Sequence, residues 1–243
     1  CSLIEKLAAW TDDLDLQDLD IETDGVAELV NSLNAGKGGL ILVSHLGNME
    51  MLRALASLKV VKVLRNFGIN SIVDFSGTAN FNRLLAEANP ESMVRLVPAN
   101  DMGPETIIML QERIAAGELV CIAGDRTPAN NRGRTNRVEF LGDPAWFPQG
   151  GFVLASLVDA PVWMLFGVRR DDLDPESRYG FHVYRSLVDL SGSRRERMVK
   201  IQKLMEEYVA HLERLCIQHP FQWYNFFDFW TDPQSGKPSM GDA

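Results

Sequence analysis

Cysteine is scarce in this chain: the sequence has three, and they are far apart, at Cys1, Cys121 and Cys216. No Cys-x-x-Cys pair and no Cys/His spacing typical of a zinc site is present, which excludes a disulfide scaffold or a zinc module. Reduced thiols are expected, as in cytoplasmic proteins. Cys121 stands in "ELVCIAG", and we interpret it as a core strand residue rather than a nucleophile.

Long hydrophobic runs are also absent. No stretch reaches the roughly 18 apolar residues of a transmembrane helix, and no signal peptide is visible. The first residue is Cys1 rather than Met, so we expect a fragment of a longer protein from which an N-terminal membrane-associated segment has been removed. Residues 1–243 contain no internal repeat or linker, and they are expected to form a single domain.

Positive charge is in deficit, with 24 Lys and Arg against 33 Asp and Glu, for a net charge of −9. This balance argues against general nucleic-acid binding, which needs cations to neutralise phosphates. One segment reverses it: "DRTPANNRGRTNR" carries Arg126, Arg132, Arg134 and Arg137, with no acid after Asp125. Arginines bind oxyanions through two parallel hydrogen bonds, which favours recognition of a phosphate. A solvated, flexible loop is the alternative.

What the chain does have is an alternation of apolar strands and amphipathic helices. Continuous apolar strands separated by helices predict an α/β fold: a mixed, mostly parallel sheet flanked by helices on both faces. The predicted strands are 39–44, 59–64, 92–98, 118–124, 136–142, 160–169 and 180–187. The predicted helices are 2–10, 24–35, 49–58, 80–88, 104–117 (closed by Gly117), 150–159 and 194–220.

The stretch "SHLGNME" places polar residues directly after the strand "GLILVS". His45 follows the carboxyl end of that strand, and Gly47 and Asn48 permit a tight turn into the next helix. If Glu50 lies in the first helical turns, its carboxylate can hold one imidazole nitrogen of His45 and leave the other free as a base. The alternative is an ordinary strand end, with Glu50 on the surface at a helix N-terminus.

With three further stretches in order, this motif resembles the lysophospholipid/glycerolipid acyltransferase superfamily, and within it the lipid A biosynthesis (late) acyltransferase branch. The three are "LQERIAAGELVCIAGDRTP" (110–128), "VEFLGDPAWFPQGGFVLASLVDAPVWMLF" (138–166) and "HPFQWYNFFDFW" (219–230). The resemblance covers about residues 25–230, and it implies the sandwich fold of the glycerolipid acyltransferases.

The resemblance also implies roles for individual residues. His45 would deprotonate an acceptor hydroxyl, Glu50 would orient His45, and no covalent acyl-enzyme would form. The tetrahedral oxyanion needs hydrogen-bond donors, which the backbone near Gly47 and Asn48, or an arginine, could supply. Asp125 and Arg126 would lie near the active site.

Other positions are left open at this point. Asp125 and Arg126 also fit a surface ion pair. Arg83 and Arg95 are weaker matches to the family's substrate-binding arginine, and either could be structural. The segment "WFPQGG" (146–151) fits an acyl channel or plain core packing.

The implied reaction moves an acyl chain from a thioester, on acyl carrier protein or coenzyme A, to a hydroxyl of a lipid or glycolipid. No permanently bound cofactor and no metal are expected. The implied location is the cytoplasmic face of the bacterial inner membrane, against the membrane surface. After the Trp of "QW" this chain has "NFFDFW" where the late acyltransferases have a His/Arg-rich stretch, so lipid A itself is not assured as acceptor.

Two other functions compete with this one. A non-catalytic lipid-binding or partner module could keep the same fold, and a thioester or lipid hydrolase could use His45 to activate water. The Gly-x-Ser-x-Gly elbow of α/β-hydrolases is absent, which disfavours the hydrolase.

Overall fold

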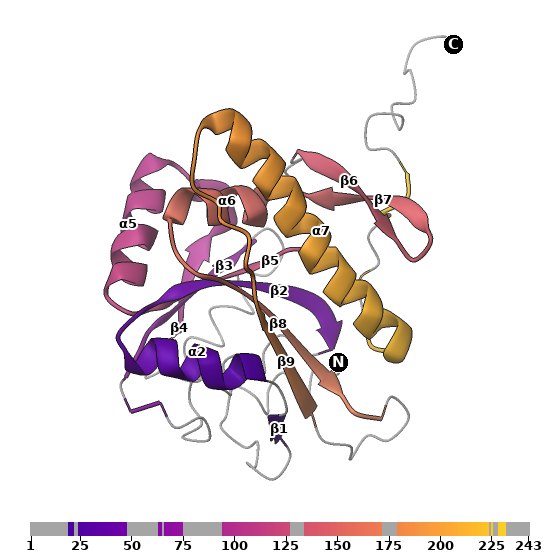
Figure 1. Ribbon diagram of the computed structural model, residues 1–243, viewed down its shortest axis with the longest axis horizontal. Coiled ribbons are helices and arrows are strands. Elements are labelled where there is room, and N and C mark those ends of the chain that lie inside the picture. Colours follow the sequence, from indigo (N-terminus) through magenta and orange to yellow (C-terminus); the bar gives the residue numbers. More distant parts are fainter. Residues whose placement is uncertain are drawn as a thin grey trace.

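The computed structural model describes most of the chain: residues 19–21, 24–47, 63–64, 66–74, 94–126, 134–171, 179–223, 225 and 228–231. Within that part, seven strands form the main sheet in the order β1-β9-β8-β2-β5-β3-β4 (Figure 1). Its strands are β1 (Leu19–Ile21), β2 (Gly39–Gly47), β3 (Ile69–Val73), β4 (Val94–Pro98), β5 (Leu119–Ala123), β8 (Val162–Arg169) and β9 (Tyr179–Arg185). Strands β6 (Thr135–Phe140) and β7 (Asp143–Pro148) form a separate antiparallel hairpin.

The sheet is mixed and mostly parallel, as predicted. Strands β8, β2, β5, β3 and β4 all run in the same direction. Only β9 and its short neighbour β1 run the other way within the described sheet. The carboxyl ends of the five parallel strands therefore meet at one edge, which is where α/β sheets commonly carry their ligand sites.

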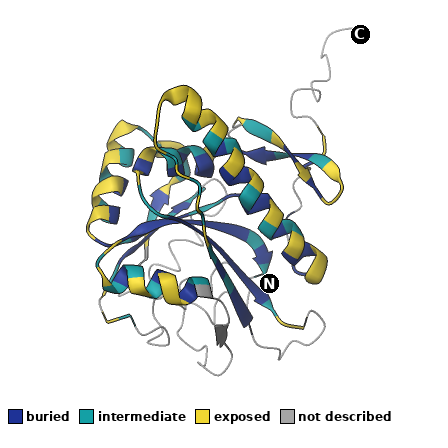
Figure 2. Cartoon of the chain, in the orientation of Figure 1, coloured by how far each residue is buried: buried dark blue, intermediate teal, exposed yellow. Residues whose placement is uncertain are grey.

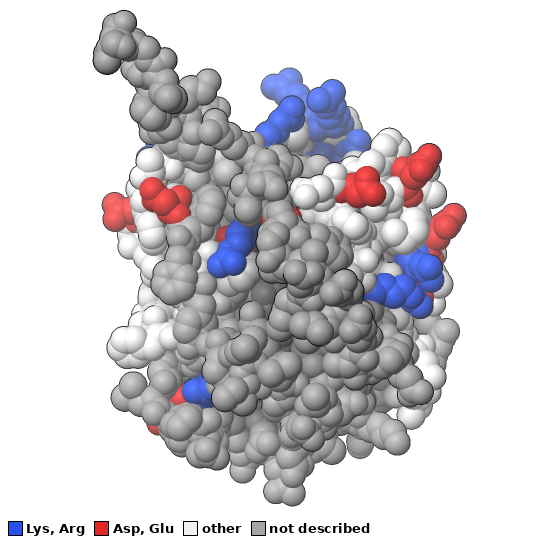
Figure 3. Space-filling model, turned by 180° about the vertical axis from the view of Figure 1, so that it is seen from behind, with Lys and Arg blue, Asp and Glu red and all other residues white. Residues whose placement is uncertain are grey.

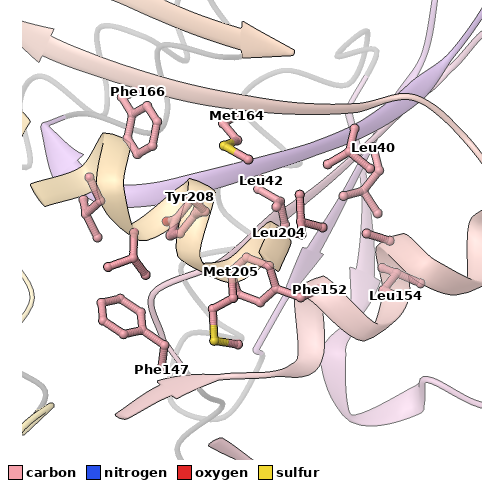
Figure 4. Packing of buried hydrophobic residues seen from close by; sticks show 14 of the residues in the cluster. Leu40, Leu42, Phe147, Phe152, Leu154, Met164, Phe166, Leu204, Met205 and Tyr208 are labelled. Atoms are coloured by element: carbon pink, nitrogen blue, oxygen red, sulfur yellow. The ribbon is translucent and has the colours of Figure 1, made fainter. Parts of the chain in front are cut away.

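Helices cover both faces of the sheet. Successive residues of its central strands point to opposite sides, so both faces carry apolar side chains that pack against helices. Leu40 and Leu42 of β2 pack in one core with α5 (Pro104–Ala115), α6 (Gly150–Val158) and α7 (Arg194–Gln218), while Ile41 and Val43 pack in a second core against α2 (Asp24–Asn34). Figure 2 shows the central strands mostly buried, and Figure 4 shows Leu40, Leu42 and Tyr208 within the first core.

The helix ends follow local sequence signals. At the start of α7, the Ser193 side chain accepts a hydrogen bond from the backbone N–H of Glu196, and the Glu196 carboxylate accepts one from the N–H of Ser193. Helix α5 ends at Ala115, and Gly117 has the positive φ of 90° that a glycine after a helix end commonly adopts. Gly117 closes this helix as predicted.

Three strands of the described structure, β1, β3 and β7, were not predicted, and one predicted strand is not confirmed. The described residues of 59–64, namely 63 and 64, are not strand, and the strand in this part of the chain is β3 at Ile69–Val73. Its sequence "INSIV" is interrupted by Asn70, which is buried, and by Ser71, so it lacks the apolar run that marks a strand. Strand β7 was also missed, since Pro144 and Pro148 disfavour a strand and are tolerated only at an edge. The predicted helices 2–10, 49–58 and 80–88 lie outside the described residues.

A histidine stacks on a tyrosine where β9 meets α7. The rings of His211 and Tyr184 are 3.9 Å apart at an angle of 6°, and the guanidinium of Arg214 donates a hydrogen bond to the Tyr184 hydroxyl at 2.7 Å. Burial, together with the nearby Arg214, lowers the pKa of His211 to about 4. His211 is therefore neutral in the native protein near pH 7.

This shift predicts an acid-sensitive contribution to stability. The unfolded chain takes up a proton at His211 near the ordinary pKa of 6.5, whereas the native protein does so only near 4. Stability should therefore fall as the pH drops through this window, and His211→Phe should lessen the loss. Urea unfolding at several pH values measures how the free energy of unfolding depends on pH in wild type and in His211→Phe. An equal pH dependence in the two proteins would contradict the assignment.

Candidate active site

His45 lies in an irregular stretch of β2 at the carboxyl edge of the sheet. Val43 pairs with Leu165 of β8, but the next pairing joins Gly47 to Gly167, so β2 advances four residues while β8 advances two. The two extra residues form a bulge, which aims side chains away from the regular pleat. His45 is therefore displaced from the sheet surface at the end where the parallel strands terminate.

The imidazole of His45 is held by the carboxylate of Asp125. Nδ1 of His45 is 2.7 Å from Oδ1 of Asp125, and the backbone N–H of His45 donates to Oδ2, also at 2.7 Å. The Asp125 side chain is fully buried, whereas the His45 side chain is 20% exposed. Among the described residues, none makes a hydrogen bond to Nε2 of His45. Within the described part of the chain, one ring nitrogen is therefore fixed by Asp125 and the other has no hydrogen-bond partner.

Adjacent parallel strands bring the two residues together. Strand β5 lies beside β2, and Asp125 follows its end by two residues. The N–H of Gly124 donates to the Val43 carbonyl at 2.9 Å, which keeps the two chain ends together beyond the regular pairing. A carboxylate and an imidazole at the ends of neighbouring strands thus meet, although the two residues are 80 apart in the sequence.

Tyr208 of α7 supports this junction from the first core. Its hydroxyl donates to the same Val43 carbonyl at 2.8 Å, and its ring would be 2.8 Å from a Cβ at Gly124. Burial, with a smaller contribution from the negative charge of Asp125, raises the pKa of Tyr208 well above its usual range. Tyr208 therefore stays protonated and donates a hydrogen bond at the base of the site.

The stretch after α7 returns along the end of β2. The amide side chain of Gln222 exchanges two hydrogen bonds with the backbone of Arg169, each 2.6 Å long. The Gln222 carbonyl accepts the N–H of Gly47 at 2.8 Å, and Trp223 forms an antiparallel bridge with Leu46. The motif "QW" therefore extends the sheet at the bulge that carries His45.

Two side chains of this stretch contact Asp125 and its neighbour. The indole N–H of Trp223 points to Oδ2 of Asp125 at 3.4 Å, and the amide N–H of Asn225 donates to the Asp125 backbone carbonyl at 2.8 Å. Oδ1 of Asn225 accepts from Nε and Nη2 of Arg126 at 3.3 and 3.2 Å. Sequence reasoning missed Asn225 and Tyr208, and only the position of Asn225 just after the "QW" motif pointed to it.

The structure thus brings His45, Gly47, Asp125 and Arg126 into one cluster. The N–H of Gly47 is already used by Gln222. Four predicted site residues, namely Asn48, Glu50, Arg83 and Arg132, lie outside the described residues, so their predicted roles stay predictions.

Three other arginines lie elsewhere on the described structure. Arg95 is level with Leu40, at the opposite end of the sheet from His45, where it pairs with Glu118 at 2.6 Å. Arg134 is exposed just before β6. Arg137 lines a surface hollow of about 400 Å³ between β6 and α7, with Glu139, Glu206 and Glu213 among its other lining residues. That hollow shares no residue with the His45 cluster.

The aromatic residues near the end of the chain divide between core and surface. Phe147 and Phe229 are fully buried and pack with Phe140, so Phe147 is a core residue. Trp230 and Phe221 are exposed by 45% and 69%. Of the described residues of the closing stretch, Gln222, Asn225 and Phe229 are buried, while the aromatic side chains of Phe221 and Trp230 lie at the surface.

A second basic segment lies at the N-terminus of α7. Residues 194–203 contain five basic side chains and one acidic one. Figure 3 shows Lys and Arg side chains gathered at the upper edge of the molecule, where Figure 1 places this helix end.

Among the described helices, none is long and apolar enough to cross a membrane. No group of three or more His, Cys, Asp and Glu side chains in the described part is placed to hold a metal ion.

An α/β sandwich with a histidine–carboxylate pair at the carboxyl edge of its parallel strands defines a class of proteins suited to acid–base chemistry. The model of the family described as bacterial lipid A biosynthesis acyltransferase matches residues 4–231. The chain therefore belongs to this family, as the sequence motifs predicted, and the family suggests acyltransferase activity on a lipid. No curated protein matches the chain.

Proposed function

We propose that this protein is an O-acyltransferase that moves an acyl chain from a thioester to a hydroxyl of a lipid or glycolipid. The observation that carries this proposal is the His45–Asp125 pair, with Nδ1 fixed at 2.7 Å and Nε2 left for a ligand. It lies in a chain of the lipid A acyltransferase family, at the edge of the sheet where α/β proteins bind their ligands.

The proposed reaction uses that geometry. Nε2 of His45 takes the proton from the acceptor hydroxyl, and the oxygen attacks the carbonyl carbon of the thioester. The tetrahedral intermediate collapses, the C–S bond breaks, and the thiolate takes the proton from the imidazolium of His45. The products are an ester and a free thiol, and Asp125 stabilises the positive imidazolium between the two proton transfers.

The role of Glu50 has to fit beside Asp125. The family motif assigns the orienting carboxylate to Glu50, but Nδ1 of His45 is held by Asp125. We propose that Asp125 keeps the ring in place and that Glu50, if it acts, acts on the substrate side of His45. For the oxyanion, Asn48 and Arg126 remain the proposed donors, because the N–H of Gly47 is engaged by Gln222.

The donor and the location are further parts of the proposal. The thioester would be carried by acyl carrier protein or coenzyme A, both of which bear phosphate. Arg126 and Arg134, both exposed, belong to the segment predicted to bind it, and the basic segment at the start of α7 offers a second cationic surface. The acceptor would lie in the cytoplasmic leaflet of the bacterial inner membrane.

The test separates transfer from hydrolysis and from plain binding. Purified protein is given a thioester donor, either acyl carrier protein loaded with an acyl chain or acyl-coenzyme A. Each donor is tested with and without a detergent-dispersed glycolipid, and the ester and free fatty acid are measured by mass spectrometry. We expect acceptor-dependent ester, reduced about 10³-fold in His45→Gln. The matched control His182→Gln, on β9, should retain activity. Release of fatty acid without an acceptor would indicate a hydrolase. Intact lipid binding without any turnover would indicate a non-catalytic binding module.

A further inference from the structure

The amide of Asn225 joins two residues of the site to each other. It donates from Nδ2 to the backbone carbonyl of Asp125 and accepts at Oδ1 from the guanidinium of Arg126. Asn225 is buried, so water is a poor substitute for either partner. Only an amide side chain can donate and accept in this way, since a carboxylate of the same shape has no N–H.

The position of Asn225 is itself fixed by the segment before it. The segment at Gln222 and Trp223 is tied to β8 and β2 by backbone and side-chain hydrogen bonds. Asn225 therefore follows a well-anchored segment, and it contacts the backbone of Asp125, whereas His45 contacts the carboxylate. Any rotation of the Asp125 backbone would move both of its carboxylate oxygens, which hold Nδ1 and the backbone N–H of His45.

We propose that Asn225 is a positioning residue: it fixes Asp125, and through it the imidazole of His45, while it aims the guanidinium of Arg126. This inference rests on the proposed function. It predicts that the first residue of "NFFDFW", the stretch that departs from the late acyltransferase pattern, belongs to the site. Asn225 makes no proton transfer, and its effect is on geometry.

Three substitutions separate this role from a merely structural one. Asn225→Asp keeps the shape but removes the N–H that Asp125 accepts, Asn225→Ala removes both contacts, and Asn225→Gln can restore both if its longer side chain fits. We expect Asn225→Asp and Asn225→Ala to lower kcat by about 10- to 100-fold with little change in KM, since small misplacements of catalytic groups cost that much. Asn100→Asp, on the exposed turn before α5, controls for the added charge.

A second measurement does not depend on any substrate. The chain has four histidines, so the ring signals of His45 can be assigned in NMR spectra by comparison with His45→Gln. In Asn225→Asp the Nδ1 proton of His45 should exchange faster with water than in wild type. Unchanged kcat and an unchanged Nδ1 signal in folded Asn225→Ala would overturn the positioning role. A shifted signal in a protein without transferase activity would refute the proposed function and leave the positioning intact.

Discussion

Asp125→Asn should lower kcat for acyl transfer about 10³-fold, as much as the loss of His45 itself. The substitution keeps the size of a fully buried side chain, but it can place an N–H where a carboxylate oxygen accepts from Nδ1. The imidazole then turns to the tautomer whose proton is on Nε2, and this nitrogen can no longer act as a base. KM should change little, because we propose that Asp125 acts through His45 and not on the substrate.

The double variant makes this prediction specific. If Asp125 works only through His45, then combining Asp125→Asn with His45→Gln should cost no more than either change alone. Asp143→Asn, the same substitution at an exposed position on β7, should leave kcat near the wild-type value. Additive losses in the double variant would mean that Asp125 acts on the substrate directly.

The same assay decides between the two carboxylates. The sequence motif favours Glu50 as the partner of His45, and the described structure places Asp125 on Nδ1. If Glu50→Gln loses activity while Asp125→Asn retains more than about a tenth of it, then the family motif identifies the orienting acid and the contact at Asp125 is secondary. Loss in both variants, with different effects on KM, would assign Glu50 to the substrate side.

The fold was predictable because its central strands are buried on both faces. Strands such as β2 and β8 then contain long apolar runs, which favour a strand buried on both faces. Two of the strands that were not predicted, β3 and β7, are only partly buried or bury a polar side chain. Strand β3 buries Asn70, whose amide is satisfied by Glu118 and the Leu119 carbonyl, and a hydropathy pattern cannot show such a pairing.

The site was half predictable for a related reason. His45 lies near the end of β2 and Asp125 follows β5, so a parallel sheet places them at the same edge even before the strand order is known. Their direct contact depends on β2 and β5 being neighbours, although 80 residues separate the pair in sequence. Asn225 lies 100 residues from Asp125 and reaches it only because α7 returns the chain to this edge.

Gly47→Ala should produce the largest loss of stability among the substitutions near the site. Gly47 has a φ of +66°, and a Cβ there would lie 1.9 Å from the backbone oxygen of Gly167. The left-handed conformation alone costs an alanine about 1–2 kcal/mol. The clash is with the backbone of β8 and cannot be relieved by a side-chain rotation, so the total should reach about 3 kcal/mol or more.

Gly142→Ala separates the cost of the left-handed backbone conformation from the cost of the steric clash. Gly142 also has a positive φ, of +88°, but nothing lies within 4 Å of its Cβ, so this variant should show the conformational cost without the clash. Calorimetry should find a loss in Tm of about 2–8 °C for Gly142→Ala and at least about 6–12 °C for Gly47→Ala. Equal losses of Tm in Gly47→Ala and Gly142→Ala would show that β2 and β8 can move apart to relieve the clash without a cost in stability. Because this strand pair holds the bulge of His45, any Gly47→Ala protein that folds should also lose acyl transfer, whereas Gly142→Ala should retain it.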